Sequence, residues 1–171
     1  MLMQVAAGKH VTSEPWTSSQ TFATSSGLSV KYIAKYSTWG EDFWEDLVAP
    51  TLGVALYTET WQNGAGRLSS FCTSDGAAWD VENVLSVDLG NGADFLETQD
   101  HSKWGVTLSD PPSLASNESK VEANSTSSLW ACVGDLNMQS GQESRAGGAL
   151  CVQDSNLYNA YANLITSAET C

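Results

Sequence analysis

Two side chains with the chemistry to act together on a phosphate are His101 and Lys103, which stand two residues apart. The surrounding segment is expected to start a β-strand, and residues i and i+2 of a strand point to the same face. An imidazole that titrates near the working pH, beside a fixed ammonium, suits phosphoryl transfer. The His attacks or donates a proton, and the Lys stabilises charge on the non-bridging oxygens. A pair at this spacing also occurs by chance on protein surfaces.

A third candidate is Asn137, which follows an apolar run expected to form a buried strand at 128–133. A strand that ends in a tight polar turn places the next side chains at the end of the sheet. There the amide of Asn137 would hydrogen-bond a phosphate or orient a catalytic group. Asp135 lies in the same turn and either supports the site or holds the turn. The other histidine, His10, lies in a polar segment and is expected on the surface.

The elements that must position these residues are read from hydrophobic periodicity, which predicts a mixed α and β fold with a sheet flanked by helices. Strands are expected at 28–36, 54–61 and 81–89, and helices at 40–48 and 155–166. Pro50 is expected to end or kink the first helix, and Ser155 to cap the second. On the second helix, Ile165 is expected to share the apolar face.

The acidic composition limits the function. The chain has 20 acidic and 7 basic residues and a net charge of −13 at pH 7. A polyanion such as DNA would be repelled at that pH, because nucleic-acid binding depends on basic side chains. Either the chain does not bind nucleic acid, or it works at a pH low enough to protonate many carboxylates. Charge alone favours the first alternative.

The four cysteines form no CxxC pair, so a zinc ribbon or a thioredoxin-like site is not expected. An even number in a secretory context predicts disulfides, and four cysteines allow three pairings. Sequons at Asn117 and Asn124 support a secretory route. Both lie in residues 109–128, which are expected to form an exposed polar loop. No stretch is long enough to cross a membrane, and residues 1–7 are too short for the apolar region of a signal peptide, so upstream sequence is expected to be missing.

Several motifs in one order resemble the deoxyribonuclease II family, within the phospholipase D superfamily. They comprise the segments 101–104, 132–137, 145–151, 32–43 and 8–16. The resemblance covers nearly the whole chain but only the C-terminal half of the family's length. It implies that residues 1–171 form one lobe, an α+β or αβα sandwich that is one half of a two-lobed fold.

The resemblance implies an acid endodeoxyribonuclease that needs neither a cofactor nor a metal, leaves 3′-phosphates and works in lysosomes or secretions. One His of the superfamily forms a phosphohistidine and the other protonates the leaving oxygen. His101 is then the general acid, with Lys103 and Asn137 completing the half-site and Asp135 and Arg145 supporting it. The resemblance also implies the disulfide pairing, which is Cys72 with Cys171 and Cys132 with Cys151.

A lone half-site does not complete a two-histidine mechanism. The first hypothesis is therefore an enzyme half that acts on DNA with an N-terminal half or with a second identical chain. The second is a catalytically inactive secreted paralogue that acts as a binding protein. The third is a chain that does not fold alone.

Overall fold

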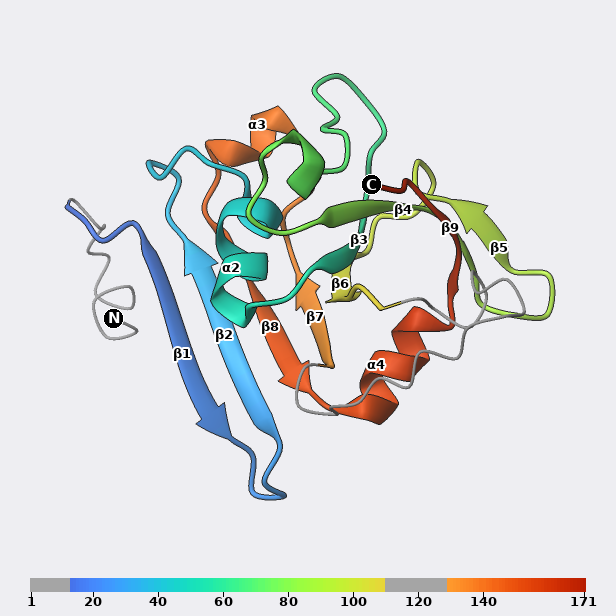
Figure 1. The fold of residues 1–171 in the computed structure, drawn as a ribbon, viewed down its shortest axis with the longest axis horizontal. Helices are drawn as coiled ribbons and strands as arrows, with labels where there is room; N and C mark the ends of the chain where they lie inside the picture. Colours follow the sequence, from blue (N-terminus) through green and yellow to red (C-terminus); the bar gives the residue numbers. More distant parts are fainter. Residues whose placement is uncertain (1–12, 110–128) are drawn as a thin grey trace.

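The computed structural model describes residues 13–109 and 129–171, which form a large open mixed sheet with few helices (Figure 1). The described residues form nine strands in the order β1-β2-β8-β7-β6-β3-β4-β5, with β9 also paired to β4. All neighbouring strands are antiparallel except β3 and β4. The strands are β1 (Thr17–Ala23), β2 (Ser29–Lys35), β3 (Leu56–Thr60), β4 (Val81–Asp88), β5 (Asp94–Leu96), β6 (Lys103–Thr107), β7 (Trp130–Gly134), β8 (Gly147–Gln153) and β9 (Ile165–Ala168). The expected loop at 109–128 lies outside the described residues from position 110 onward.

The strands that periodicity predicts, at 28–36, 54–61, 81–89 and 128–133, correspond to β2, β3, β4 and β7. The periodicity did not predict β1 or β8. Strand β1 is polar and pairs only with β2, so it buries little apolar surface. Strand β8 begins in a Gly-rich segment, and its place between β2 and β7 depends on partners far away in sequence.

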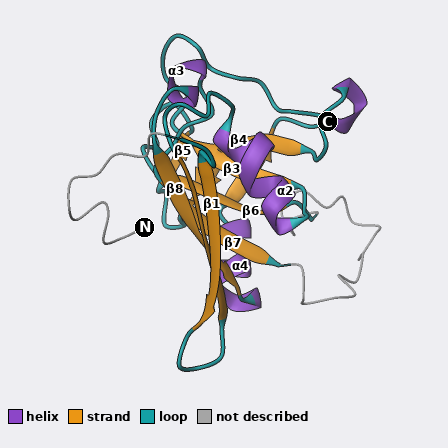
Figure 2. Cartoon of the chain, turned by 90° about the vertical axis from the view of Figure 1, so that its left-hand side faces the viewer, coloured by secondary structure: helices purple, strands orange, loops and turns teal. Residues whose placement is uncertain are grey.

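Apolar side chains form two clusters on opposite faces of the sheet. Leu56 and Trp130 belong to one cluster, whereas their chain neighbours Tyr57 and Ala131 belong to the other. Alternate residues of a strand point to opposite faces, so β3 and β7 each contribute to both clusters. The first cluster packs against the π-helix η1 (Trp44–Val48) and α2 (Ala49–Leu52), and the second against α4 (Ser155–Ala162). Figure 2 shows the sheet nearly edge-on, with α2 beside it.

The helix expected at 40–48 begins later and continues past Pro50 to Leu52. The expectation that Pro50 ends it was therefore wrong. The preceding turn is widened, with the backbone N–H of Ala49 bonded to the oxygen of Trp44, five residues back. Pro50 then stands in the first turn of α2, where its missing N–H costs little. Gly53, in the left-handed conformation at φ 71°, ends the helix.

The C-terminal helix also differs from the expected one at both ends. Asp154, rather than Ser155, caps α4, because its carboxylate accepts a 2.8 Å hydrogen bond from the backbone N–H of Leu157. The helix ends at Ala162, and Ile165 begins β9 instead of extending the helix face. Ile165 is nevertheless fully buried, because β9 pairs with β4 beside α4. Ile165 has the spacing of a helix residue, but it is buried because it lies in a strand of the sheet.

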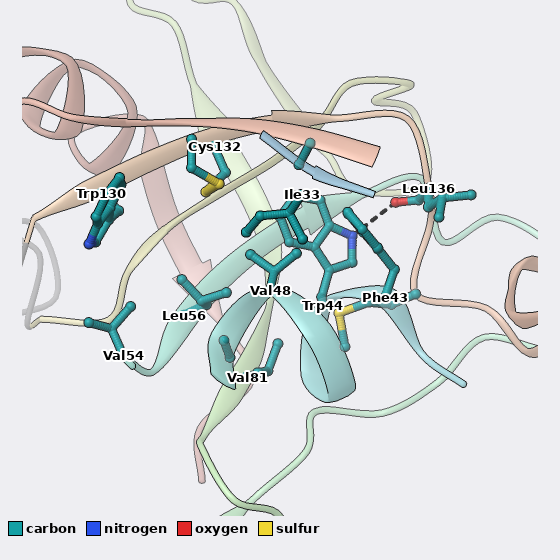
Figure 3. Packing of buried hydrophobic residues seen from close by; sticks show 14 residues of the cluster. Ile33, Phe43, Trp44, Val48, Val54, Leu56, Val81, Trp130, Cys132 and Leu136 are labelled. Atoms are coloured by element: carbon teal, nitrogen blue, oxygen red, sulfur yellow. Dashed lines mark hydrogen bonds between the residues drawn. A yellow bond between two sulfur atoms is a disulfide. The ribbon is translucent and has the colours of Figure 1, made fainter. Parts of the chain in front are cut away.

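Trp44 lies at the centre of the first cluster and is fully buried (Figure 3). Its ring lies against two strand glycines, Gly105 of β6 and Gly134 of β7. A Cβ atom at either position would meet the ring at 3.0 or 3.1 Å. The sheet therefore needs glycine at both positions for the indole to approach the backbone this closely.

Two disulfides join Cys72 to Cys171 and Cys132 to Cys151, the pairing that the family resemblance implies. Cys132 and Cys151 stand opposite each other on the neighbouring strands β7 and β8. None of the described helices is long and apolar enough to cross a membrane.

Candidate functional site

The sequence-predicted site residues gather at one end of the sheet, where β3 and β7 finish and β6 and β8 begin. Thr60, the last residue of β3, pairs with Lys103, the first residue of β6. Gly134, the last of β7, pairs with Ala149 near the start of β8. We call this the site end of the sheet; α3 (Ser140–Glu143) lies beside it (Figure 1). Antiparallel pairing alone brings these termini together.

His101 lies in the turn before β6 rather than on the strand, because the strand begins at Lys103. Strand alternation therefore does not relate the two side chains. They are related by a hydrogen bond, in which the ammonium of Lys103 donates to the backbone oxygen of His101. The imidazole of His101 is exposed and stacks against the indole of Trp61, with ring centroids 4.1 Å apart. Action of both side chains on one phosphate stays a prediction.

Lys103 is half-buried and surrounded by carboxyl groups. Burial lowers the pKa of its ammonium, and the negative charges of Asp100, Asp135 and Glu59 act in the opposite direction. These carboxyls come from three places in the chain: the turn before β6, the turn after β7, and β3. The charges of Asp100 and Asp135 oppose the approach of an anion to Lys103.

Asp135 holds the turn that follows β7. Its Oδ1 atom accepts a 2.8 Å hydrogen bond from the backbone N–H of Gly148 in β8. The neighbouring Gly147 has no room for a side chain, because a Cβ there would stand 2.4 Å from the same oxygen. Of the two roles considered for Asp135, the geometry supports the structural one and also brings its charge close to Lys103.

Asn137 is buried, with 6% of its surface exposed, and its Oδ1 atom has no hydrogen-bond partner among the described residues. The next residue, Met138, donates its backbone N–H to Oγ1 of Thr60 over 3.2 Å. Because Thr60 pairs with Lys103, this bond brings the chain at Asn137 to the site end. An unpaired buried amide oxygen costs free energy, which is typical of a group kept for function.

Arg145 is exposed between α3 and β8, next to the site end. Within the described part of the chain its guanidinium forms no ion pair or hydrogen bond, so it is available to an anion. His10 and the sequons at Asn117 and Asn124 lie outside the described residues.

Periodicity and motif spacing did not single out Glu59 and Trp61. Glu59 is fully buried in β3, and neither of its carboxyl oxygens has a partner among the described residues. Burial raises its pKa to about 9, helped by the charges of Asp100 and Glu97 and opposed by Lys103. The sequence feature that could have identified Glu59 is that it is the one acidic residue of β3, whose other residues are apolar or Thr. A carboxyl is rarely buried in a strand for packing alone, because its burial costs free energy.

Lys35 is a buried cation at the same end of the sheet, but its contacts are structural. Its ammonium donates to the backbone oxygens of Glu41 (3.0 Å) and Gln142 (3.2 Å) and also to that of Glu143. Burial lowers its pKa, opposed mainly by the charge of Asp42. It therefore holds α3 against β2, and we do not expect it to contact a phosphate.

Across residues 13–109 and 129–171, no group of three or more His, Cys, Asp or Glu side chains has an arrangement that could hold a metal ion. Independence from metals stays a prediction about the reaction.

Comparison with known proteins gives matches along the whole chain. A sequence model of the Deoxyribonuclease II family matches residues 1–171. Plancitoxin-1 of Acanthaster planci is 34% identical over 170 residues, which cover 99% of this chain and 42% of that protein. Deoxyribonuclease-2-alpha of Sus scrofa is 34% identical over 170 residues, with the same shares of each chain. A putative deoxyribonuclease-2 of Burkholderia thailandensis is 38% identical over 141 residues, covering 81% of this chain and 35% of the relative. This chain thus spans about two fifths of the length of the curated relatives.

Proposed function

Because this chain belongs to the deoxyribonuclease II family, we propose that it supplies half of the active site of a metal-independent acid endonuclease. The substrate is DNA, and the products end in 3′-phosphates. The observation that carries the proposal is that segments reaching the site end carry three groups: an exposed imidazole, a half-buried ammonium and a buried amide oxygen without a partner among the described residues. They belong to His101, Lys103 and Asn137.

His101 acts as general acid. A histidine from the other half-site attacks phosphorus, and His101 gives its proton to the 5′-oxygen as the bond between that oxygen and phosphorus breaks. The 3′-phosphate is then held on the attacking histidine. Water attacks this phosphohistidine, His101 takes up the proton from the water, and the 3′-phosphate is released.

The other groups stabilise charge and orientation. Lys103 stabilises negative charge on the non-bridging oxygens, and the exposed guanidinium of Arg145 contacts a neighbouring phosphate. The amide of Asn137 either donates from its Nδ2 to the bound phosphate, or orients the imidazole by accepting its N–H on Oδ1, the oxygen that has no partner within the described residues. Asp135 supports the site by fixing the turn between β7 and β8.

The second half-site comes from an N-terminal half like the part of the relatives that this chain does not span, or from a second identical chain. Residues 1–171 then form one lobe of a two-lobed, phospholipase D-like fold. The open mixed sheet, with apolar clusters and helices on both faces, is consistent with such a lobe.

An acid working pH reconciles the net charge of −13 with a DNA substrate. Carboxylates in general take up protons at low pH, which lowers the repulsion between an acidic chain and DNA. The two disulfides fit an oxidising compartment, so we place the protein in lysosomes or in secretions.

The test measures nicking of supercoiled plasmid at about pH 5 in the presence of EDTA, together with the size of the chain by light scattering. His101→Ala should abolish nicking, whereas the matched variant of the other histidine, His10→Asn, should retain it. Nicking that survives His101→Ala contradicts the assignment. A strict monomer that does not nick plasmid rules out catalysis by two identical chains.

A further inference from the structure

The indole of Trp61 is the ring against which the exposed imidazole of His101 lies. Their centroids are 4.1 Å apart and their planes meet at 33°. Within the described part of the chain, the imidazole makes no hydrogen bond of its own. An exposed histidine without other contacts samples several rotamers. The orientation of this imidazole therefore depends on the stack.

Trp61 is itself fixed from two directions. Its Nε1–H donates a 3.0 Å hydrogen bond to the backbone oxygen of Thr98. Its backbone oxygen accepts a 3.3 Å hydrogen bond from the side chain of Gln139, two residues after Asn137. The indole is thus tied to the turn that leads into His101, and the backbone of Trp61 to the segment that carries Asn137. It is a rigid platform rather than a mobile surface ring.

The backbone of His101 is held on both sides. Asp100 accepts 2.8 Å hydrogen bonds from the N–H and the hydroxyl of Ser102. On the other side of the same turn, the ammonium of Lys103 donates to the oxygen of His101. With the backbone fixed, the χ angles of the imidazole are the remaining freedom at this residue.

We propose that Trp61 is a positioning residue that holds the His101 imidazole in the orientation from which it transfers its proton to the leaving oxygen. The inference rests on the proposed function of His101. An aromatic face packs well against the flat imidazole and also attracts it when it is cationic, so the contact persists through the proton transfer. Restricting the acid to one orientation before the reaction lowers the entropic part of the barrier.

The test compares Trp61→Leu, which removes the platform, with Trp61→Phe, which keeps an aromatic face. The control is Trp39→Leu, which removes a half-buried tryptophan that contacts Lys35 instead. NMR at about pH 5 records the imidazole resonances, which are simple to follow because the chain has 2 histidines. Plasmid nicking gives kcat and KM separately for each variant.

We expect Trp61→Leu to remove the ring-current shift from the His101 resonances and to leave those of His10 unchanged. Nicking should fall about tenfold or more in kcat, with KM changed less than about threefold, since a misplaced catalytic group loses rate rather than substrate binding. Trp61→Phe should keep most of the His101 ring-current shift and most of the kcat for nicking. Trp39→Leu should match the parent chain in both quantities.

Two results would overturn the inference. One is a folded Trp61→Leu variant with the parent kcat. The other is an unchanged His101 ring-current shift in that variant. If the parent chain does not nick DNA by itself, catalysis by two identical chains fails instead. The NMR comparison of Trp61→Leu with Trp61→Phe then still decides whether Trp61 orients the imidazole.

Discussion

The indole Nε1–H of Trp44 donates a 2.9 Å hydrogen bond to the backbone oxygen of Leu136, which joins the centre of the core to the segment between Asp135 and Asn137 (Figure 3). The bond spans 92 positions of sequence and is fully buried. A core side chain therefore sets the place of the turn that carries two predicted site residues. Stability and site geometry are coupled through this contact.

Replacing Trp44 by Phe should reveal this coupling. The change leaves the oxygen of Leu136 buried without its donor and opens a small cavity. The matched control is Trp130→Phe, because Trp130 belongs to the same cluster, is 7% exposed and is not bonded to Leu136. We expect Trp44→Phe to lower the free energy of unfolding by about 1–3 kcal/mol more than the control, as measured by urea denaturation. Equal losses would mean that the hydrogen bond contributes nothing.

The buried carboxyl of Glu59 should make the protein more stable in acid. Its pKa is raised to about 9 in the folded chain, mainly by burial, from an ordinary value of 4.5. The folded state therefore binds this proton more tightly than the unfolded state does. Its contribution is fully present below about pH 4.5 and is lost as the pH rises towards 9, with a slope of up to about 1.4 kcal/mol per pH unit.

Glu59→Gln should remove this dependence, because the amide is neutral at every pH. Thermal unfolding between pH 5 and pH 9 measures it, with the exposed Glu41→Gln as the matched control. A variant at Glu59 with the same fall in Tm as the parent chain would show that the carboxyl does not titrate in this way.

Loss of the disulfide between Cys132 and Cys151 should cost both stability and activity. The bridge closes a separation of 19 residues, for which chain entropy predicts about 3 kcal/mol. The Cys72–Cys171 bridge closes 99 residues and should contribute about 1–2 kcal/mol more. Double Cys→Ala variants of each bridge, compared by denaturation, check the order.

The nicking rate should fall more on loss of the Cys132–Cys151 bridge than on loss of the Cys72–Cys171 bridge, which is the opposite of the order expected for stability. The first bridge joins β7 to β8, the strands that flank the turn of Asp135, whereas the second joins Cys72 to Cys171, neither of which lies in a strand. Equal nicking rates for the two double variants, at a pH where both are folded, would mean that the Cys132–Cys151 bridge does not affect the geometry of the site.

Lys103 should be required for cleavage rather than for folding. Lys103→Met keeps the apolar stem but removes the charge, and we expect nicking to fall about 100-fold or more, with little change in Tm. Lys103→Arg keeps the charge and should retain part of the rate, although its planar fork differs from an ammonium. Full activity of Lys103→Met would exclude Lys103 from phosphate stabilisation.

Substitutions of Asp135 distinguish its two effects. It holds the turn after β7, and it adds negative charge near Lys103. Asp135→Ala removes the acceptor for the Gly148 N–H and should cost about 1–2 kcal/mol. Asp135→Asn keeps an acceptor oxygen and should stay close to the parent in stability. If the charge also opposes phosphate binding near Lys103, Asp135→Asn should lower KM towards neutral pH; an unchanged profile would leave only the role in the turn.

The sequence by itself determined the local features of this protein. Hydrophobic pattern predicted β2, β3 and β4, because the apolar residues that mark a strand lie within its own short segment. The types and spacing of His101, Lys103 and Asn137 defined the candidate chemistry, because the residue type fixes which functional group is present in any fold. The motifs carried the family resemblance and, with it, the disulfide pairing.

The tertiary structure decided which distant residues meet. The stack of Trp61 on His101 joins segments 40 positions apart, and the bond from Trp44 to Leu136 joins segments 92 positions apart. The burial of Glu59 depends on which strands flank β3. Ile165 illustrates the same limit, since its spacing fits a helix but pairing with β4 makes it a strand residue. Strand order and register are set by packing of the whole sheet, and no local period encodes them.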